Sequence, residues 1–309
     1  MTTLLFTHDA CVEHHTGDHH PESSDRLRAV HAALDDESFD DLTRREAPLA
    51  SVEQIALVHE SAYVDSVLAA IPASGHRHLD PDTVVSPLSG EAALRGAGAV
   101  VAAVDAVVTE PSVGNAFCAV RPPGHHAERA RSMGFCLFNN VAVGALHARV
   151  THGLQRAAVV DFDVHHGNGT QHMFEADKDL FYASSHQAPF YPGTGAASEA
   201  GVGNIFNAPL AAGAGSAEFR NAFETVILPG LRDFDPDILL VSAGFDAHAD
   251  DPLAQLRLTE DDYRWVTREL LAVAAECCES RVVSTLEGGY DLGALARSVK
   301  VHVRELMAV

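Results

Sequence analysis

The stretch AAVVDFDVHHGNGT, residues 157–170, passes from an apolar run into two aspartates and two histidines within six positions. The apolar run has the length and composition of a buried strand. Because side chains alternate faces along a strand, Asp161, Asp163 and His165 are predicted to point the same way, with His166 pointing away. A carboxylate and an imidazole at adjacent heights suit a divalent ion. The stretch therefore predicts a strand with a metal-binding carboxyl end.

Two other interpretations of this stretch compete with a metal site. An isolated Asp-x-His pair is often only a solvated or capping group, because short motifs match by chance. A phosphate loop is excluded more directly, since GNGT lacks the Gly-x-x-x-x-Gly-Lys-Ser/Thr pattern and no lysine is nearby. The metal interpretation gains weight only from residues elsewhere in the chain.

The remainder of the chain alternates apolar runs with helical patterns. Strands are predicted at 4–7, 115–120, 157–162, 180–184, 237–243 and 281–286, and helices at 23–34, 90–108, 139–150, 216–228 and 259–276. Thr259 and Asp262 form an acidic capping box at the start of the last helix. Pro229 and Gly230 are predicted to kink or end the helix that starts at 216. This alternation predicts a three-layer α/β fold with a mainly parallel sheet.

Polar, glycine-rich segments follow five of the predicted strands. These segments are RPPGHH from 121, DVHHGNG from 163, SSHQAPFYPGTG from 184, GFDAHADDP from 244 and EGGYD from 287. Ligands of open α/β sheets bind outside the carboxyl ends of the strands. The five segments are therefore predicted to converge on one site.

Within these segments, four further side chains are candidates for chemistry. Asp246 lies at a strand end from which it could supply a third metal ligand, and one histidine with two aspartates leaves a coordination position open, as in catalytic zinc sites. The tandem His125 and His126 suit a general base and its electrostatic partner. Tyr290 follows a glycine pair that permits a sharp turn, and its phenol could donate a hydrogen bond to an oxyanion.

Composition limits the class of protein. The 309 residues are 47% hydrophobic with no linker-like segment, which predicts a single domain spanning 1–309. The net charge is −22, and Lys178 and Lys300 are the only lysines, so direct nucleic-acid binding is not expected and a cationic substrate is favoured. No apolar run is long enough to predict a membrane span. Five scattered cysteines favour a reducing cytoplasm.

Several histidines lie outside the five segments. His14, His15, His19, His20, His76 and His78 are treated as surface or loop residues. The first four belong to HHTGDHHPE, a rival metal-binding cluster that lacks accompanying carboxylates at strand ends.

Taken together, RPPGHHA, GFCLFNN, DFDVHHGNGTQ, YPGTG, SAGFDAHADDPL and LEGGYDL resemble the zinc-dependent histone deacetylase family, specifically its class II branch and the bacterial acetylpolyamine and deacetylase-like amidohydrolases. The motifs run in family order from about residue 14 to 292. The resemblance implies an arginase-like α/β fold with a central eight-stranded parallel sheet. It also implies hydrolysis of an N-acetylated amine, such as acetyl-lysine, to acetate and the free amine.

The resemblance also implies roles for individual residues. Asp163, His165 and Asp246 would bind one catalytic zinc ion. His126 would be the general base and later acid, assisted by His125 with Asp161 behind it, and Tyr290 would polarise the acetyl carbonyl. The remaining implied residues form two groups: a substrate tunnel of Gly134, Phe135, Tyr191 and Leu253, and a structural potassium site formed by oxygens of Asp161, Asp163, His165, Ser184 and Ser185.

Three positions refine this expectation. Asn168 stands where class I members carry aspartate, so His126 would have a neutral partner and be less basic. Leu253 stands where polyamine-selective members carry an acidic gatekeeper, which disfavours a dedicated acetylpolyamine deacetylase. Tyr290 is tyrosine, not the histidine of weakly active vertebrate class IIa enzymes, which predicts real activity.

Two alternatives to the zinc deacetylase are open at this point. DAHAD at 246–250 looks like an arginase-type motif and raises a binuclear manganese ureohydrolase, although that site would need more bridging carboxylates. A non-enzymatic module that binds acetylated ligands is the other, but recognition alone does not need a group that activates water. The sequence does not identify the substrate, and it is compatible with either a monomer or an oligomer.

Overall fold

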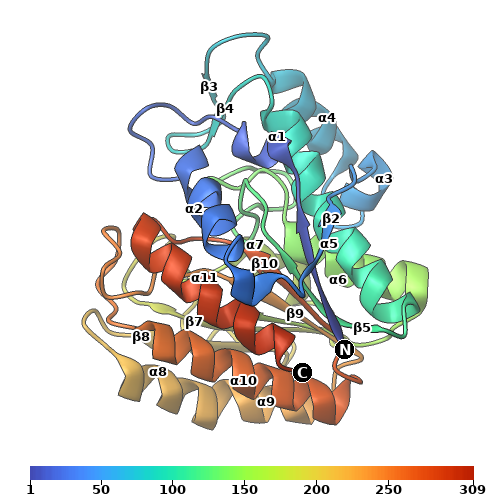
Figure 1. Cartoon of the computed structure of the whole chain (residues 1–309), viewed down its shortest axis with the longest axis vertical. Coiled ribbons are helices and arrows are strands. Elements are labelled where there is room, and N and C mark those ends of the chain that lie inside the picture. Colours follow the sequence, from blue (N-terminus) through green and yellow to red (C-terminus); the bar gives the residue numbers. More distant parts are fainter.

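The computed structural model describes residues 1–309, and its centre is an eight-stranded sheet in which every pairing is parallel (Figure 1). The strands lie in the order β2-β1-β5-β10-β9-β6-β7-β8. Their bounds are β1 (Thr2–Thr7), β2 (Thr43–Glu46), β5 (Val113–Cys118), β6 (Ala157–Asp161), β7 (Leu180–Gln187), β8 (Ile205–Leu210), β9 (Ile238–Ala243) and β10 (Val282–Leu286). A separate hairpin pairs β3 (Arg77–His78) with β4 (Val84–Val85).

All six predicted strands are confirmed, with shifts of a few residues at their ends. The two strands of the sheet that the sequence analysis did not find are its edges, β2 and β8. The β2 sequence TRRE is polar and mostly exposed, so it carries no apolar pattern. The β8 sequence IFNAPL contains Pro209, a residue that sheets accept at an edge because it lacks an N–H donor.

The five predicted helices are present, and others were not assigned from sequence. The helices are α1 (Asp9–Val12), α2 (Ser24–Leu34), α3 (Val52–Ile55), α4 (Ser61–Ala70), α5 (Ser89–Thr109), α6 (Asn140–His152), α7 (Asn168–Phe174), α8 (Ser216–Ala222), α9 (Leu228–Phe234), α10 (Glu260–Cys277) and α11 (Leu292–Met307), with a 3₁₀ turn, η1 (Glu37–Phe39). The capping interaction of α10 is present, since the Thr259 N–H donates to the Asp262 carboxylate at 3.0 Å. The helices that were not predicted from the sequence are α1, α3, α4, α7 and α11.

The helical segment that starts at Ser216 does not end at Pro229 and Gly230. After α8 it continues through a π-helical turn, η2 (Phe223–Ile227), directly into α9, which extends to Phe234. A proline ring inside a regular helix meets the carbonyl four residues earlier. The wider π turn ends at Ile227, two residues before Pro229, so the disturbance takes the form of a local widening instead of a helix end.

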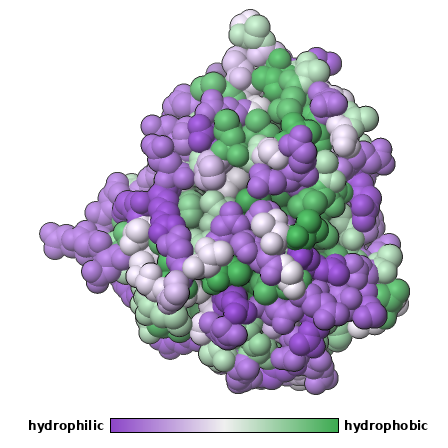
Figure 2. Space-filling model, turned by 90° about the vertical axis from the view of Figure 1, so that its right-hand side faces the viewer, coloured by the Kyte–Doolittle hydropathy of each residue, from purple (hydrophilic) through white to green (hydrophobic).

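Helices cover both faces of the sheet, which confirms the three-layer fold. On one face α5 and α6 pack against each other and against β5, β6 and β9, while α2, α9, α10 and α11 cover the other face (Figure 1). A continuous core of 84 buried residues fills the space between the layers. The helix α5 is long and apolar enough to cross a membrane by length and composition alone, but 67% of its apolar window is buried, as in a core helix. The face turned to the viewer in Figure 2 is largely hydrophilic, with smaller apolar areas.

The sheet order determines where the polar segments meet. The strands β5, β10, β9 and β6 are direct neighbours in the centre of the sheet and end at the same edge. Their following loops carry the PPGHH segment, Glu287 to Tyr290, Asp246, and Asp163 with His165. Four of the five predicted segments therefore leave the sheet side by side.

The core also contains a neutral histidine that makes folding stability sensitive to acid. Burial lowers the pKa of His302 from 6.5 to about 3. Its ring lies 2.7 Å from Thr267 Oγ1 and 2.8 Å from Ser284 Oγ, and the Thr267 hydroxyl already donates to the Tyr263 carbonyl. The neutral ring therefore donates through Nδ1 to Thr267 and accepts through Nε2 from Ser284.

We expect the free energy of unfolding to fall as the pH decreases from about 6.5 toward 4, because the unfolded chain binds a proton that folded His302 does not. This group contributes up to about 1.4 kcal/mol per pH unit in that window. Urea unfolding of the wild type and His302→Gln at several pH values measures it: the stability difference between them should shrink as the pH falls. A difference independent of pH would contradict the assignment.

Candidate active site

Asp163, His165 and Asp246 form a buried cluster at the carboxyl ends of β6 and β9. His165 Nδ1 lies 3.0 Å from Asp163 Oδ1 and 3.2 Å from Asp246 Oδ2, and one ligand atom from each residue lies within 4.8 Å of the others. The strand β6 ends at Asp161, so strand alternation is not what orients the two residues that follow. Instead the loop is held by its own carboxylates: Asp161 accepts from the Asp163 N–H at 3.1 Å, and Asp163 accepts from the His165 N–H at 2.9 Å.

The cluster has the properties expected of a cation site. Asp246 Oδ2 is buried and accepts no well-formed hydrogen bond, because the nearby His165 nitrogen faces Asp163 as well. Burial and the charge of Asp163 raise the pKa of Asp246 to about 7. Gly288 passes directly over both carboxylates, and a Cβ at this position would collide with them. Two carboxylates and an imidazole are a ligand set that zinc accepts, so these residues fit a divalent ion.

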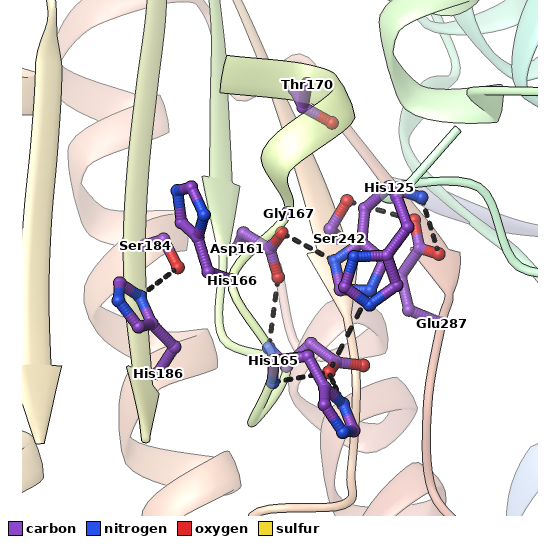
Figure 3. Close-up of polar contacts among 12 residues, drawn as sticks. His125, Asp161, His165, His166, Gly167, Thr170, Ser184, His186, Ser242 and Glu287 are labelled. Atoms are coloured by element: carbon purple, nitrogen blue, oxygen red, sulfur yellow. Dashed lines mark hydrogen bonds and ion pairs between the residues drawn. The ribbon is translucent and has the colours of Figure 1, made fainter. Parts of the chain in front are cut away.

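His125 is held as a charged partner beside the cluster (Figure 3). Its Nδ1 donates to Asp161 Oδ2 at 2.9 Å, and the Tyr182 hydroxyl donates to the same oxygen at 3.1 Å. Although burial lowers its pKa, the charges of Asp161 and Asp163 dominate and raise it to about 10. His125 is therefore an imidazolium at neutral pH.

His126 is the neutral member of the pair. Its Nδ1 lies 2.8 Å from Asn168 Oδ1, and the orientation of that amide is fixed because Asn168 Nδ2 donates to Glu128 at 2.5 Å. His126 therefore carries its proton on Nδ1 and leaves Nε2 free to accept one. Burial, together with the charges of His125 and His165, lowers its pKa well below 6.5. A neutral imidazole that faces a cavity is the form a general base requires.

Glu287, which was not among the predicted site residues, holds the backbone that leads into the histidine pair. One of its carboxylate oxygens accepts from the Gly124 N–H at 2.7 Å and the His125 N–H at 3.2 Å, and the other accepts from Ser242 at 3.0 Å (Figure 3). Burial raises its pKa to about 7. The LEGGYD motif contained this residue, but only the fold shows that it reaches the PPGHH turn.

Tyr290 follows the sharp turn that was predicted from the glycine pair before it. Gly289 has a φ of 125°, a conformation that favours glycine, and the Tyr290 N–H donates to Asp251 Oδ2 at 2.7 Å. The Arg26 guanidinium lies 4.8 Å from the centre of the Tyr290 ring. Burial raises the pKa of Tyr290 well above 10, so its hydroxyl keeps the proton and can donate it in a hydrogen bond.

A buried network of charged side chains holds the backbone of the turn that precedes Tyr290. Arg26 donates to the carbonyls of Gly289 and Glu287, both at 2.5 Å, and to Glu22 at 2.9 Å. Arg121 also donates to Glu22, at 2.5 and 2.7 Å. Burial raises the pKa of Glu22, but the two guanidinium charges dominate and lower it to about 2. No local pattern in the sequence indicates this network, because Arg121 lies 99 residues from Glu22 and the Gly289 carbonyl lies 263 residues from Arg26.

A cavity of about 90 Å³ opens onto these groups. It is lined by predicted residues (His125, His126, Gly134, Phe135, His165, Tyr191, Leu253 and Tyr290) and by Asp82, Pro123 and Gly288, which were not predicted. Gly134 and Phe135 have φ values of 56° and 69°, and a Cβ on Gly134 would collide with the His126 ring. A left-handed conformation at a phenylalanine is strained, and such strain concentrates at functional sites.

Asp82 is a carboxylate among the residues that line the cavity. Burial and the neighbouring Asp80 raise its pKa. It lies in the short DPDT loop between β3 and β4, where an Asp-Pro-Asp turn looks like an ordinary surface loop. No sequence pattern distinguishes it.

Ser184, Ser185 and His166 lie beside the cluster without lining the cavity. Ser184 pairs with Asp161 across β6 and β7, and its hydroxyl lies 2.8 Å from His186 (Figure 3). Ser185 Oγ is buried and has no hydrogen-bond partner. His166 contacts Thr194 at 2.7 Å and Gln171 at 2.8 Å, away from the ligand cluster as predicted.

The histidines assigned to the surface divide into two kinds. His15, His19, His76 and His78 are exposed, whereas His14 lies in a loop but is buried, 2.7 Å from Ser89 Oγ and 3.6 Å from Glu22. His20 is half-buried against the Phe135 ring, with 4.8 Å between ring centres. The HHTGDHHPE segment does not bring three ligand atoms together.

This arrangement defines the class of protein. A parallel α/β sheet with a buried Asp–His–Asp cluster, a neutral histidine beside a charged one, and a tyrosine around one cavity is typical of metal-dependent hydrolases.

Comparisons with known proteins identify the family within that class. The sequence model of the histone deacetylase domain family matches residues 20–306 of this chain. Histone deacetylase 14, chloroplastic, of Arabidopsis thaliana is 40% identical over 98% of this chain and 76% of its own length. The histone deacetylase-like amidohydrolase of Pseudomonas aeruginosa is 36% identical over 94% of this chain and 82% of its own length. The crystal structure of the HDA15 HD domain superposes with a TM-score of 0.94 at 35% identity, covering 99% of this chain and 88% of that one.

The chain therefore belongs to the histone deacetylase family. The expected arginase/deacetylase fold with its eight-stranded parallel sheet is confirmed. Membership supports hydrolase and deacetylase activity and implies a metal cofactor.

Proposed function

We propose that this protein is a zinc-dependent deacetylase that removes acetyl groups from acetyl-lysine or a similar N-acetylated amine. The observation that carries the proposal is the cavity lined by neutral His126, by Tyr290 and by His165, the member of the Asp163–His165–Asp246 cluster that reaches it. Each of the three serves a different need of amide hydrolysis: ligands for a Lewis acid, a base and a donor to the developing oxyanion.

The proposed roles follow from the protonation states. A zinc ion, when bound, supplies Lewis acidity that polarises a carbonyl and acidifies water. His126 Nε2 accepts a proton from the attacking water and afterwards gives it to the leaving amine. The negative charge of Asp161 beside Nδ1 favours the imidazolium form of His125, and this positive charge would favour the anion that develops nearby. Asn168 keeps His126 in the correct tautomer.

The walls of the cavity support a narrow substrate. Phe135, Tyr191 and Gly134 would enclose an alkyl chain, with Leu253 among the same lining residues. The carboxylate of Asp82 favours substrates that carry N–H donors or positive charge beyond the acetyl group, and the net charge of −22 favours the same chemistry. Leu253 in place of an acidic gatekeeper makes a dedicated acetylpolyamine deacetylase the less favoured variant.

The proposal also includes a structural potassium ion, a cytoplasmic location and no direct binding of nucleic acid. A structural potassium ion near Asp161, Asp163, His165, Ser184 and Ser185 is supported by the buried Ser185 hydroxyl that lacks a partner. A cytoplasmic location is supported by five free cysteines, which a reducing compartment preserves. Direct binding of nucleic acid is disfavoured by the charge.

The manganese ureohydrolase is less well supported than the zinc deacetylase. At this edge of the sheet the group whose ligand atoms all lie within 4.8 Å of one another has two carboxylates and one histidine, which suits one ion. His248 of the DAHAD motif lies 3.5 Å from Glu260 and outside that group. A turnover panel tests the proposal: the zinc-loaded protein should release acetate from an acetyl-lysine peptide or an acetylated amine. Turnover of guanidino substrates with manganese, and none of acetylated amines with zinc, would contradict it.

Substitution of Tyr290 tests the oxyanion role. Tyr290→Phe is expected to lower kcat by roughly 10²–10³-fold, the usual effect of removing one oxyanion donor, with zinc content unchanged. Steady-state kinetics on an acetyl-lysine peptide, together with metal analysis, measures both quantities. Tyr63→Phe is a matched control for loss of a buried hydroxyl, because Tyr63 donates to the Leu137 carbonyl and does not line the cavity. Full turnover by Tyr290→Phe would show that the hydroxyl has no such role.

A further inference from the structure

A second group of metal-ligating side chains lies where the C-terminal ends of α5 and α6 meet, and none of its members lines the active-site cavity. Asp105 lies near the end of α5, and His147 and His152 lie in the last turns of α6. The two helices pack side by side on one face of the sheet (Figure 1).

The geometry of this group is that of three ligands around one point. The Nε2 atoms of His147 and His152 each lie 2.7 Å from Asp105 Oδ1. The two imidazole rings are 5.6 Å apart and nearly perpendicular, at 81°. One ligand atom from each residue lies within 4.8 Å of the others, as in the catalytic cluster. A single carboxylate oxygen thus faces two imidazole nitrogens.

Two features favour a cation over a simple hydrogen-bonded contact between helices. Thr151 Oγ1 lies 3.1 Å from His147 Nδ1, so a hydroxyl can accept the Nδ1 proton and leave Nε2 unprotonated toward Asp105, as in the outer shell of metal sites. The Asp105 side chain is 47% exposed while the His147 side chain is only 6% exposed, so an ion can enter from solvent and water can complete its coordination.

The electrostatic environment also suits a cation. His147 and His152 lie at the C-terminal end of a helix, where the unpaired carbonyls carry partial negative charge. The whole chain has a net charge of −22, which raises the local concentration of cations. Two imidazoles and one carboxylate are ligands that ions of the zinc, cobalt, nickel and copper class bind in preference to calcium or magnesium.

We propose that Asp105, His147 and His152 form a second binding site for a zinc-class divalent ion, distinct from the active site, which links the ends of α5 and α6. The proposal does not depend on the deacetylase activity. An ion that binds the folded state here would stabilise it, because the ligands come together only on folding.

The test uses the full chain, stripped with a chelator and then dialysed against Zn²⁺. His152→Gln is the informative variant, since a glutamine amide can still donate to Asp105 but does not replace an imidazole ligand. His78→Ala is the matched control, because it removes an exposed histidine that belongs to no such group. The wild type and His78→Ala are expected to bind about one equivalent of zinc per chain more than His152→Gln. Equal zinc content in the wild type and His152→Gln would overturn the proposal.

A second measurement separates this site from the catalytic one. In an Asp163→Ala background, which removes an active-site ligand, zinc is expected to raise the Tm, and adding His152→Gln is expected to abolish that rise. An equal rise with and without His152→Gln would overturn the second site. Zinc binding at the active site is measured separately, as the difference in zinc content between the wild type and the Asp163→Ala single variant.

Discussion

Asp163→Ala is expected to lose about one equivalent of zinc relative to the wild type, since the proposed site has only three protein ligands. Deacetylation is expected to fall by roughly 10³-fold or more, because Lewis-acid stabilisation of several kcal/mol is lost with the ion. Asp163 also accepts hydrogen bonds from the N–H groups of His165 and Gly288, at 2.9 and 2.8 Å, so the variant loosens the cluster as well. Metal analysis and turnover of an acetyl-lysine peptide measure the two effects.

The neighbouring aspartate provides a matched control for this loss. Asp161 is equally buried and lies two residues earlier, but its carboxylate bonds His125, Tyr182 and a backbone N–H and is not one of the three zinc ligands. Asp161→Asn is therefore expected to keep its zinc while losing activity through His125. Retention of wild-type zinc by Asp163→Ala would show that the ligand assignment is wrong.

His126→Gln is expected to lower kcat by roughly 10²–10⁴-fold, the usual contribution of a general base, with zinc content unchanged. Glutamine can still bond Asn168 but cannot accept a proton at neutral pH. Single-turnover and steady-state kinetics on the same peptide distinguish loss of chemistry from loss of binding. A decrease confined to the affinity for substrate would contradict the role of His126 as base.

The amide partner of His126 offers a milder change with a distinct signature. Asn168→Asp places a carboxylate 2.8 Å from His126 Nδ1, which favours the charged imidazole and raises its pKa. On the acid side, activity should therefore be lost at a higher pH in the variant than in the wild type, and the pH profile of kcat/KM measures this shift. A purely structural role for Asn168 would lower activity without moving the profile.

The sequence predicted the centre of the fold better than its edges. Strands with continuous apolar runs, such as 157–162 and 237–243, are buried on both faces and therefore carry a strong signal. The edge strands β2 and β8 face solvent or contain proline, so their sequences follow different constraints. The helix α7 begins with Asn-Gly, which has low helix propensity, but it is mostly buried and its Thr170 N–H donates to the His125 carbonyl at 3.2 Å.

Residues of the site were predictable where chemistry and local spacing coincide. Asp163, His165, Asp246, the His125–His126 pair and Tyr290 each follow a recognisable strand, and the cavity brings the histidines and the tyrosine together as predicted. The reason given for the orientation of Asp163 and His165 was wrong, since they follow the end of β6 and are oriented by hydrogen bonds within a loop.

The sequence by itself thus determined the order of the elements, the types of catalytic group and the family, because apolar periodicity and motif residues are local properties of the chain. Only the tertiary structure decided which groups act on one another. Glu287 reaches the turn before His125, Arg26 packs on Tyr290, and Asp82 joins the cavity, through contacts that span up to hundreds of residues. Their charges, and so the protonation states of the histidine pair, depend on burial and on neighbours brought close by folding, which no local pattern encodes.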